Sequence, residues 1–407
     1  MYPNTSIMNM EQDLLKRIYE ARKKADSFFD SLESQGRSKY TVNHDVLKFP
    51  SACLYGAWSR VCGKILISEN VETTHHLESI VKEILSYKTS EGLFFPDELW
   101  IQKPAKSYEY LKLHTYNYAA GALRAFDSEI DLSSSFMDWY LNPEHLQRWL
   151  DARSFSRPWE ESNNIVNVAS YLAWKSETGC EDGVKCLEIL YNWHHKYQDP
   201  KTGGFGNLRR SYNPTLQSMA GAVHNFHIHH YLDMRMQCEN VIASNVIPYL
   251  FEGPLTACLS IDFVELGVYS LPYIKDSLRR ELIAALLFHA ERLLAYQRND
   301  GGWLEGEDCS SPTAAAGMKE NSASSCSYAT WFRLCSLGMV AISLLGDKDE
   351  NWHFRNTLGM GYLNTKLLCQ YEIPSQLDVK KIRVKYLKTT KKGRIQKRLI
   401  RFASKFI

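Results

Sequence analysis

The stretch Ala295-Tyr296-Gln297-Arg298-Asn299-Asp300-Gly301-Gly302-Trp303 indicates how the chain is built. A segment with helical spacing of apolar residues begins at Ser277, breaks at the Asn-Asp-Gly-Gly turn, and is followed directly by a tryptophan. Residues 87–94 and 197–205 repeat this order of helix-like segment, polar turn with glycine, and aromatic residue. Because a glycine turn can end a helix and let an aromatic side chain fold back onto it, three copies roughly 100 residues apart predict a repeated helix-pair unit.

Helical periodicity continues through most of the chain, and strand-like alternation is nearly absent. Leu282, Leu286, His289 and Leu293, for example, have the spacing that places side chains on one face of a helix. The pattern predicts helices over 10–35, 51–66, 73–88, 112–127, 142–151, 160–177, 181–197, 215–232, 236–250, 257–271, 277–297, 327–346 and 350–370. So many helices with short links predict an all-α fold, an (α/α)6-type toroid of helix hairpins, with a superhelical array of hairpins as the alternative.

The composition, with 407 residues of which 44% are hydrophobic and 12% aromatic, predicts a large buried core. We expect three parts: an N-terminal helix and loop (1–50), the helical toroid (51–370) and a C-terminal basic amphipathic tail (371–407). No apolar run reaches the roughly 18 to 20 residues that a membrane-spanning helix needs, and residues 1–9 lack the pattern of a secretory signal. The ten cysteines form no CxxC pair, which favours reduced thiols and a cytoplasmic protein.

The tail is strongly basic, because residues 379–407 hold twelve of the 48 Lys and Arg residues and no Asp or Glu. From residue 394 onward, apolar and basic residues have helical spacing, and the basic face holds Lys397, Arg398, Arg401 and Lys405. Such a helix is typical of segments that lie on an anionic membrane surface, so we expect peripheral attachment to the inner membrane. Nucleic acid and an acidic protein partner are the alternatives, and nucleic acid fits poorly because few aromatic residues lie among the basic ones.

Two predicted links are too long to serve only as connections. Residues 91–112 are rich in Phe, Trp, Tyr and Pro, whereas residues 304–328 consist mostly of Gly, Ser, Ala, Glu and Asp. A link of the second kind is either a lid over a site or a disordered segment, and the sequence leaves both open.

The third glycine turn, Gln297-x-x-Asp300-Gly301-Gly302-Trp303, resembles the QW-type turn of the squalene-cyclase and prenyltransferase repeat family, and residues 198–205 resemble a weaker copy. Residues 162–164, 218–224 and 258–266 are similar to bacterial helical-toroid proteins with such repeats. The resemblance implies an α-toroid and, if the protein is an enzyme, a terpene cyclase-like or prenyltransferase-like one. The same toroid also hosts non-enzymatic proteins, so the resemblance is more specific for the fold than for the reaction.

The chain departs from this family at both of its reaction centres. Class II cyclases use an Asp-x-Asp-Asp acid, whereas the corresponding stretch here has only Asp262 and, one turn later, Glu265. The protein prenyltransferases use an Asp, Cys and His zinc set, but after Asp308 and Cys309 the only histidine is His353. Neither reaction therefore transfers, and we expect no metal and no cofactor.

Two acidic side chains are candidate catalytic groups. Asp262 and Glu265 lie three residues apart on one face of an apolar predicted helix. A carboxylate pair in an apolar wall would have one raised pKa, which would give an acid and a base near neutral pH. The alternative is that Asp262 caps the helix and Glu265 lies on the surface.

Four histidines, at 224, 227, 229 and 230, crowd the predicted helix 215–232. His224 and His227 share a face and could act as general base and electrophile, or hydrogen-bond a polar substrate. A metal site would need a third ligand that the sequence does not provide. Ordinary packed histidines are the remaining interpretation.

Polar residues at the starts of two other helices are candidate substrate-binding groups. Trp159, Glu161, Asn163 and Asn164 open the predicted helix 160–177, where free backbone N–H groups and a tryptophan platform suit sugar hydroxyls or an anion. A capped helix end with Trp159 as a hydrophobic staple is the alternative. His114 and Tyr116 occupy a comparable position on the predicted helix 112–127. Trp303, which follows the third glycine turn, completes the set of expected substrate-binding residues.

Three functions fit these observations. The first is a membrane-associated toroid that acts by acid/base chemistry on a lipid-linked, isoprenoid or saccharide substrate, for example in cell-surface polysaccharide biosynthesis. The second is a non-catalytic scaffold or binding module at the membrane. The third is an (α/α)6 glycan lyase or hydrolase. The sequence has no Gly-rich nucleotide loop and no GxSxG motif.

Overall fold

The computed structural model describes residues 5–32, 53–67, 73–94, 108–127, 129–205, 214–253, 255–306, 324–354 and 364–387. Within these ranges the regular structure is helical, with isolated β-bridges and no β-strand, which confirms the predicted all-α class. Among the same residues, no helix is both long enough and apolar enough to cross a bilayer. The basic residues Lys397, Arg398, Arg401 and Lys405 lie outside the described ranges.

Six helices are buried on nearly every side. They are α2 (Cys53–Ile67), α5 (Tyr108–Phe126), α8 (Pro158–Glu177), α10 (Pro214–Tyr231), α12 (Ala257–Ser270) and α14 (Ser327–Leu344). These buried helices pack in sequence order, α2 on α5, α5 on α8, α8 on α10, α10 on α12 and α12 on α14, and α14 packs in turn on α2.

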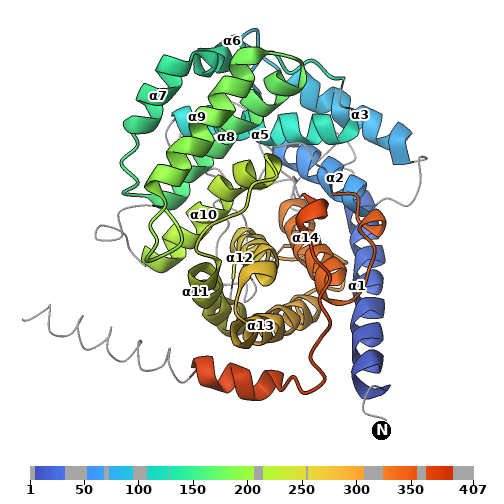
Figure 1. Ribbon diagram of the computed structural model, residues 1–407. Coiled ribbons are helices and arrows are strands. Elements are labelled where there is room, and N and C mark those ends of the chain that lie inside the picture. The colour runs from blue at the N-terminus through green and yellow to red at the C-terminus, as the bar shows by residue number, and fades with distance from the viewer. Residues whose placement is uncertain are drawn as a thin grey trace, which may run out of the picture.

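The remaining long helices are half-exposed and each carries one apolar stripe. They are α1 (Thr5–Ser31), α3 (Thr73–Ser86), α7 (Pro143–Asp151), α9 (Glu181–Tyr197), α11 (Glu239–Glu252) and α13 (Asp276–Ala295). Most cover the buried helices: α3 packs on α2 and α5, α9 on α8, α11 on α12, α13 on α14, and α1 on both α2 and α14 (Figure 1). Short helical segments complete the chain at α6 (Ser135–Asp138), η2 (Trp139–Leu141) and η3 (Leu271–Tyr273).

The three predicted glycine corners follow α3, α9 and α13 and have the same backbone geometry. In each, the residue that opens the turn donates its backbone N–H to the carbonyl of the residue before the aromatic one, at 2.7–2.9 Å. The glycine before that carbonyl has a positive φ, and the aromatic side chain is buried. The opening residues are Thr89, Asp199 and Arg298, the glycines Gly92, Gly203 and Gly301, and the aromatic residues Phe94, Phe205 and Trp303.

The third corner also holds two distant parts of the chain together. Gln297 Nε2 donates to the carbonyls of Gly301 and, on α1, of Ala21, both at 2.8 Å. A Cβ atom on Gly301 would collide with the carbonyl of Lys24, so the close approach of α1 requires glycine there as well as its φ of +89°. This corner therefore fixes α1 against the end of α13.

The predicted helix 350–370 is wrong. Its described part contains only the short segments η5 (Asp349–Asn351) and η6 (Thr365–Leu367), and residues 355–363 lie outside the described ranges. The chain turns inward instead, because Trp352 is buried, donates its indole N–H to Asp347 at 2.9 Å, and packs over Gly338 of α14. The burial of Trp352 therefore outweighs the helical periodicity of residues 350–370.

The first part of the basic tail, residues 379–387, is helical and lies along α13 (Figure 1). Lys385 and Tyr386 both hydrogen-bond the carboxylate of Glu281 on α13. The Arg383 guanidinium lies 4.3 Å from the centre of the Phe288 ring. These contacts hold helix 379–387 against α13.

Candidate functional site

The acidic residues of α12 meet the histidines of α10. His227 Nε2 lies 2.9 Å and 3.0 Å from the two carboxyl oxygens of Glu265, and His230 Nδ1 lies 3.6 Å from the nearer one. Asp262 is one turn before Glu265 on the same helix, and both carboxyl groups are buried. We call His224, His227, Asp262 and Glu265 the His–carboxylate cluster.

The two carboxyl groups of the cluster have opposite pKa shifts. Burial by itself would raise the pKa of Glu265, but the charge and hydrogen bonds of His227 and His230 outweigh it and lower the pKa. Asp262 has no such partner, so burial first, and then the charges of Glu265 and Glu305, raise its pKa well above the usual range of an aspartate. One turn of helix therefore holds two buried carboxyl groups whose pKa values are shifted in opposite directions.

Burial, together with the charges of His227 and His114 and against the opposing charge of Glu265, lowers the pKa of His224 to about 3, so the imidazole is neutral. Its ring centre is 6.2 Å from that of His227. Among the described residues, neither ring nitrogen of His224 has a hydrogen-bond partner, and the same holds for Oδ2 of Asp262. The cluster thus contains buried polar atoms that the protein itself does not satisfy.

Electrostatic interactions connect side chains of helices that are not neighbours in the chain. His114 of α5 is close enough to His224 of α10 to contribute to the lowered pKa of His224, and Asp262 of α12 contributes to the raised pKa of Tyr118 on α5, which burial dominates. In the described structure α5 is not a packing neighbour of α10 or α12, since α8 lies between α5 and α10. These pairs of side chains, from helices that are not neighbours in the chain, therefore lie within electrostatic range of each other.

The predicted residues at the start of α8 have mixed positions. Asn163 donates to the carbonyl of Trp159 at 3.1 Å, and Trp159 is half-buried against the core. Glu161 pairs with Arg153 at 3.5 Å, although burial raises its pKa. Asn164 is buried, and its side-chain oxygen has no hydrogen-bond partner among the described residues. Of this set, Asn164 has the free hydrogen-bonding capacity that a ligand could use.

Two predicted site residues do not join the cluster. The Tyr116 hydroxyl donates to the carbonyl of Leu132 at 2.7 Å, and its ring packs edge-on against Tyr171. The Trp303 indole N–H donates to the carbonyl of Leu293 at 2.8 Å, where it closes the third corner. Both polar groups have structural partners, so the expectation that these two residues bind substrate is not supported by their contacts.

The sequence analysis missed the aromatic residues beside the cluster. Tyr110 stacks on His114 with ring centres 5.0 Å apart, and Trp58 lies 4.2 Å from Tyr118. Cys258, one turn before Asp262, interacts with the hydroxyl of Tyr328 on α14. The only signal of these residues in the sequence is their aromatic character. Periodicity could not assign them to the site, because it does not distinguish the faces of a fully buried helix.

A serine and a histidine behind α12 do not form a nucleophilic pair. Ser260 Oγ is 2.7 Å from His289 Nε2, and Arg292 Nη2 is 2.9 Å from His289 Nδ1. Because arginine has only donors, Nδ1 must accept, so Nε2 carries the proton and donates to the serine. His289 therefore cannot accept a proton from Ser260.

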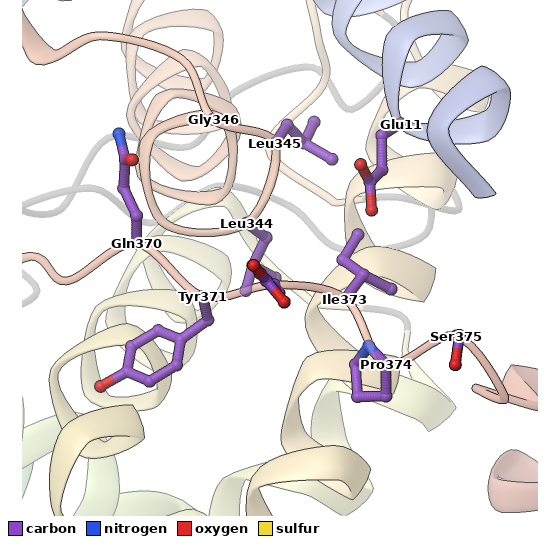
Figure 2. A pocket seen from close by; sticks show the side chains of 10 residues that line it. Glu11, Leu344, Leu345, Gly346, Gln370, Tyr371, Ile373, Pro374 and Ser375 are labelled. Carbon is purple, nitrogen blue, oxygen red and sulfur yellow. The ribbon is translucent and has the colours of Figure 1, made fainter. Parts of the chain in front are cut away.

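A pocket of about 850 Å³ lies elsewhere, between the start of α1, the end of α14 and residues 370–375 (Figure 2). It contains Glu11 and Glu372 but none of the predicted site residues. Leu344 on its wall is sixteen residues along α14 from Tyr328, or about 24 Å at the rise of an α-helix. The pocket is therefore separate from the His–carboxylate cluster.

Among the described residues, no three His, Cys, Asp or Glu side chains are arranged to hold a metal ion. Comparison of the chain with protein-family models, with curated proteins and with solved structures finds no match. The function must therefore be inferred from the chemistry of the His–carboxylate cluster.

Proposed function

We propose that this chain is a membrane-associated helical toroid that binds a lipid-linked, isoprenoid or saccharide substrate between its buried helices and acts on it by acid/base chemistry. Cell-surface polysaccharide biosynthesis is a process that uses such substrates at the inner membrane. The observation that carries the proposal is the pair of carboxyl groups, Asp262 and Glu265, with opposite pKa shifts one helical turn apart.

Opposite shifts in a buried pair are how proteins place an acid and a base in one site. Asp262, held protonated, is suited to donate a proton to a leaving group or double bond. Glu265, ionised and hydrogen-bonded to His227, is suited to accept one through the imidazole. Neutral His224 completes the set as a hydrogen-bonding group.

The packing of the helices supports the toroid. Each buried helix packs on the next in the chain, α14 packs on α2, and the half-exposed helices cover them from outside. Side chains that interact across non-adjacent helices are expected when helices surround a common axis, and a superhelical array of hairpins would leave α2 and α14 apart.

The exposed lysines at the start of the tail support membrane attachment. Lys380, Lys381 and Lys385 lie on the exposed side of helix 379–387, and the sequence that follows adds further basic residues. Each basic residue near an anionic membrane surface contributes about 1 kcal/mol, so the combined attraction is appreciable even after screening.

The proposal of catalysis is tested by Asp262→Asn, which keeps the side-chain shape but cannot donate the acid proton. We expect the product of the pathway, measured as cell-surface polysaccharide in a deletion strain complemented with each variant, to fall about 100-fold or more. The matched control is Asp182→Asn, an exposed aspartate on α9, which should complement fully. Normal product with Asp262→Asn and with His224→Ala would exclude catalysis and favour the scaffold function.

The membrane proposal is tested by a truncation that removes residues 388–407. This variant keeps helix 379–387 and its contacts with Glu281, so the body should remain folded. We expect the full chain, but not the truncated one, to sediment with vesicles that contain anionic lipid, and high salt to weaken the binding. Equal sedimentation of both proteins would contradict attachment through the tail.

A further inference from the structure

We infer that the substrate of the His–carboxylate cluster is an uncharged saccharide, not a hydrocarbon chain and not a uronic acid. This inference rests on the proposed function, because it assumes that the cluster is the binding site. It goes further by choosing one class among the substrates that the proposed function allows. Three features support it: buried polar atoms without hydrogen-bond partners, aromatic rings beside the cluster, and the carboxyl groups of the cluster.

Three helices each present a buried polar group that the described residues do not satisfy. These are the side-chain oxygen of Asn164 on α8, both ring nitrogens of His224 on α10, and Oδ2 of Asp262 on α12. The three side chains are only 4–5% exposed. A buried polar atom that is covered by a hydrocarbon loses its hydrogen bonds to water and gains none, so each such atom weakens isoprenoid binding by about tenfold or more.

A hydroxyl group can satisfy all three because it both donates and accepts. The neutral imidazole of His224 offers one donor and one acceptor, the amide oxygen of Asn164 accepts, and protonated Asp262 can donate. A sugar ring carries several hydroxyls at fixed spacing, so one ligand can reach groups on several helices. Sites built to hydrogen-bond hydroxyls discriminate strongly against analogues that lack them.

The opposite side of the cluster is aromatic. His114 and Tyr110 are stacked with an angle of 20° between the rings, and Tyr118 packs on Trp58. Tyr118 also interacts electrostatically with Asp262, so the aromatic and polar groups lie within electrostatic range of one another. A pyranose has an apolar face of C–H groups and a polar edge of hydroxyls, which matches a wall of rings opposite a wall of polar groups.

The charge of the site decides between saccharides. Asp262 and Glu265 are buried one helical turn apart, and Glu305 is close enough to Asp262 to contribute to its raised pKa. Burial lowers the pKa of His224 and of His230, which disfavours their charged forms. A carboxylate on the ligand would be repelled by these carboxyl groups, and the imidazole of His227, which could offset them, is already paired with Glu265 at 2.9 Å. The same sugar without the carboxylate avoids this repulsion.

The test measures equilibrium binding to the full-length protein by tryptophan fluorescence, with three probes: cellobiose, its uronic acid counterpart cellobiouronic acid, and farnesol in detergent micelles. We expect cellobiose to bind more tightly than the other two. In His224→Leu, which replaces the imidazole with an apolar group of similar volume, cellobiose should bind at least tenfold more weakly and farnesol no more weakly. Circular dichroism checks that the variant is folded.

The outcomes separate this inference from the proposed function. Tighter binding of farnesol, changed by His224→Leu, would overturn the saccharide class while leaving the cluster as the binding site. Tighter binding of the uronic acid would overturn the charge argument. If His224→Leu and Asn164→Leu alter the binding of no probe, both the saccharide inference and the proposed site are wrong.

Discussion

His224 and His289 are both buried, and burial lowers the pKa of both, but their surroundings differ. His289 lies between Ser260 and Arg292, with a hydrogen bond at each ring nitrogen. His224 has no hydrogen-bond partner among the described residues. A protein core can hold a neutral histidine as a structural bridge when both nitrogens are paired, whereas a histidine without partners weakens the fold and indicates a ligand site.

The same contrast exists within helix α12. Ser260 and Asp262 are two residues apart, so they point about 200° apart around the helix and face different surroundings. Ser260 faces α13 and is hydrogen-bonded to His289, while Asp262 faces Tyr118 and the cluster. Among the described residues, the Ser260 side of the helix thus has its polar group paired within the fold, whereas Oδ2 of Asp262 has no hydrogen-bond partner.

The largest expected effect is on stability, when each histidine is replaced by leucine. His289→Leu leaves the Ser260 hydroxyl and the Arg292 guanidinium without their shared partner in the core. The free energy of unfolding, measured by urea denaturation, should fall by about 3 kcal/mol. His224→Leu removes no hydrogen bond and buries an apolar group, so its stability should be unchanged or higher. Equal losses for the two variants would remove the distinction between them.

A smaller effect is expected for Asp262→Asn. The folded-state pKa of Asp262 is raised, so the stability that belongs to its neutral form is present below the unfolded-state pKa near 4 and is lost as pH rises. Asparagine keeps that neutral form at every pH, and should therefore increase the free energy of unfolding by about 1–3 kcal/mol at pH 8. At pH 3.5 the variant and the original protein should be alike. Lower stability of the variant at pH 8 would show that Asp262 is ionised in the fold.

The sequence was sufficient to predict the helices and the three corners. Glycine turns and amphipathic stripes are local signals, so α9 was predicted with both its ends, and most other helices to within a few residues. The helix expected over 350–370 failed because the anchoring of Trp352 beside Gly338 depends on a contact with α14 that no local pattern contains. The short α6 and η2 were not predicted, because segments of three or four residues are too short to show helical periodicity.

The candidate site was predicted only in part. The spacing of Asp262 and Glu265 placed them on one face, and the capping alternative fails because Thr256 caps α12 through its bond to the Leu259 N–H. The pairing of Glu265 with His227 joins two helices and could not be read from either alone. Tyr116 was expected in the site because its position on the predicted helix 112–127 is comparable to that of the polar residues that open the predicted helix 160–177. Both faces of α5 are buried, however, so composition does not reveal which side faces the cluster.

The smallest expected effect is on the acid dependence of stability, and it concerns His224. Its folded-state pKa is about 3, so between pH 6.5 and pH 4 the unfolded chain takes up a proton there and the folded chain does not. This group therefore contributes stability above pH 6.5 that is lost as pH falls, with a slope of up to about 1.4 kcal/mol per pH unit. His224→Gln should reduce the slope, measured from urea denaturation at pH 6, 5 and 4.5, by that amount. If His224→Gln has no effect on the slope, the pKa of His224 is not lowered in the folded protein. Its ring nitrogens would then be hydrogen-bonded to water, and they would not indicate a ligand site.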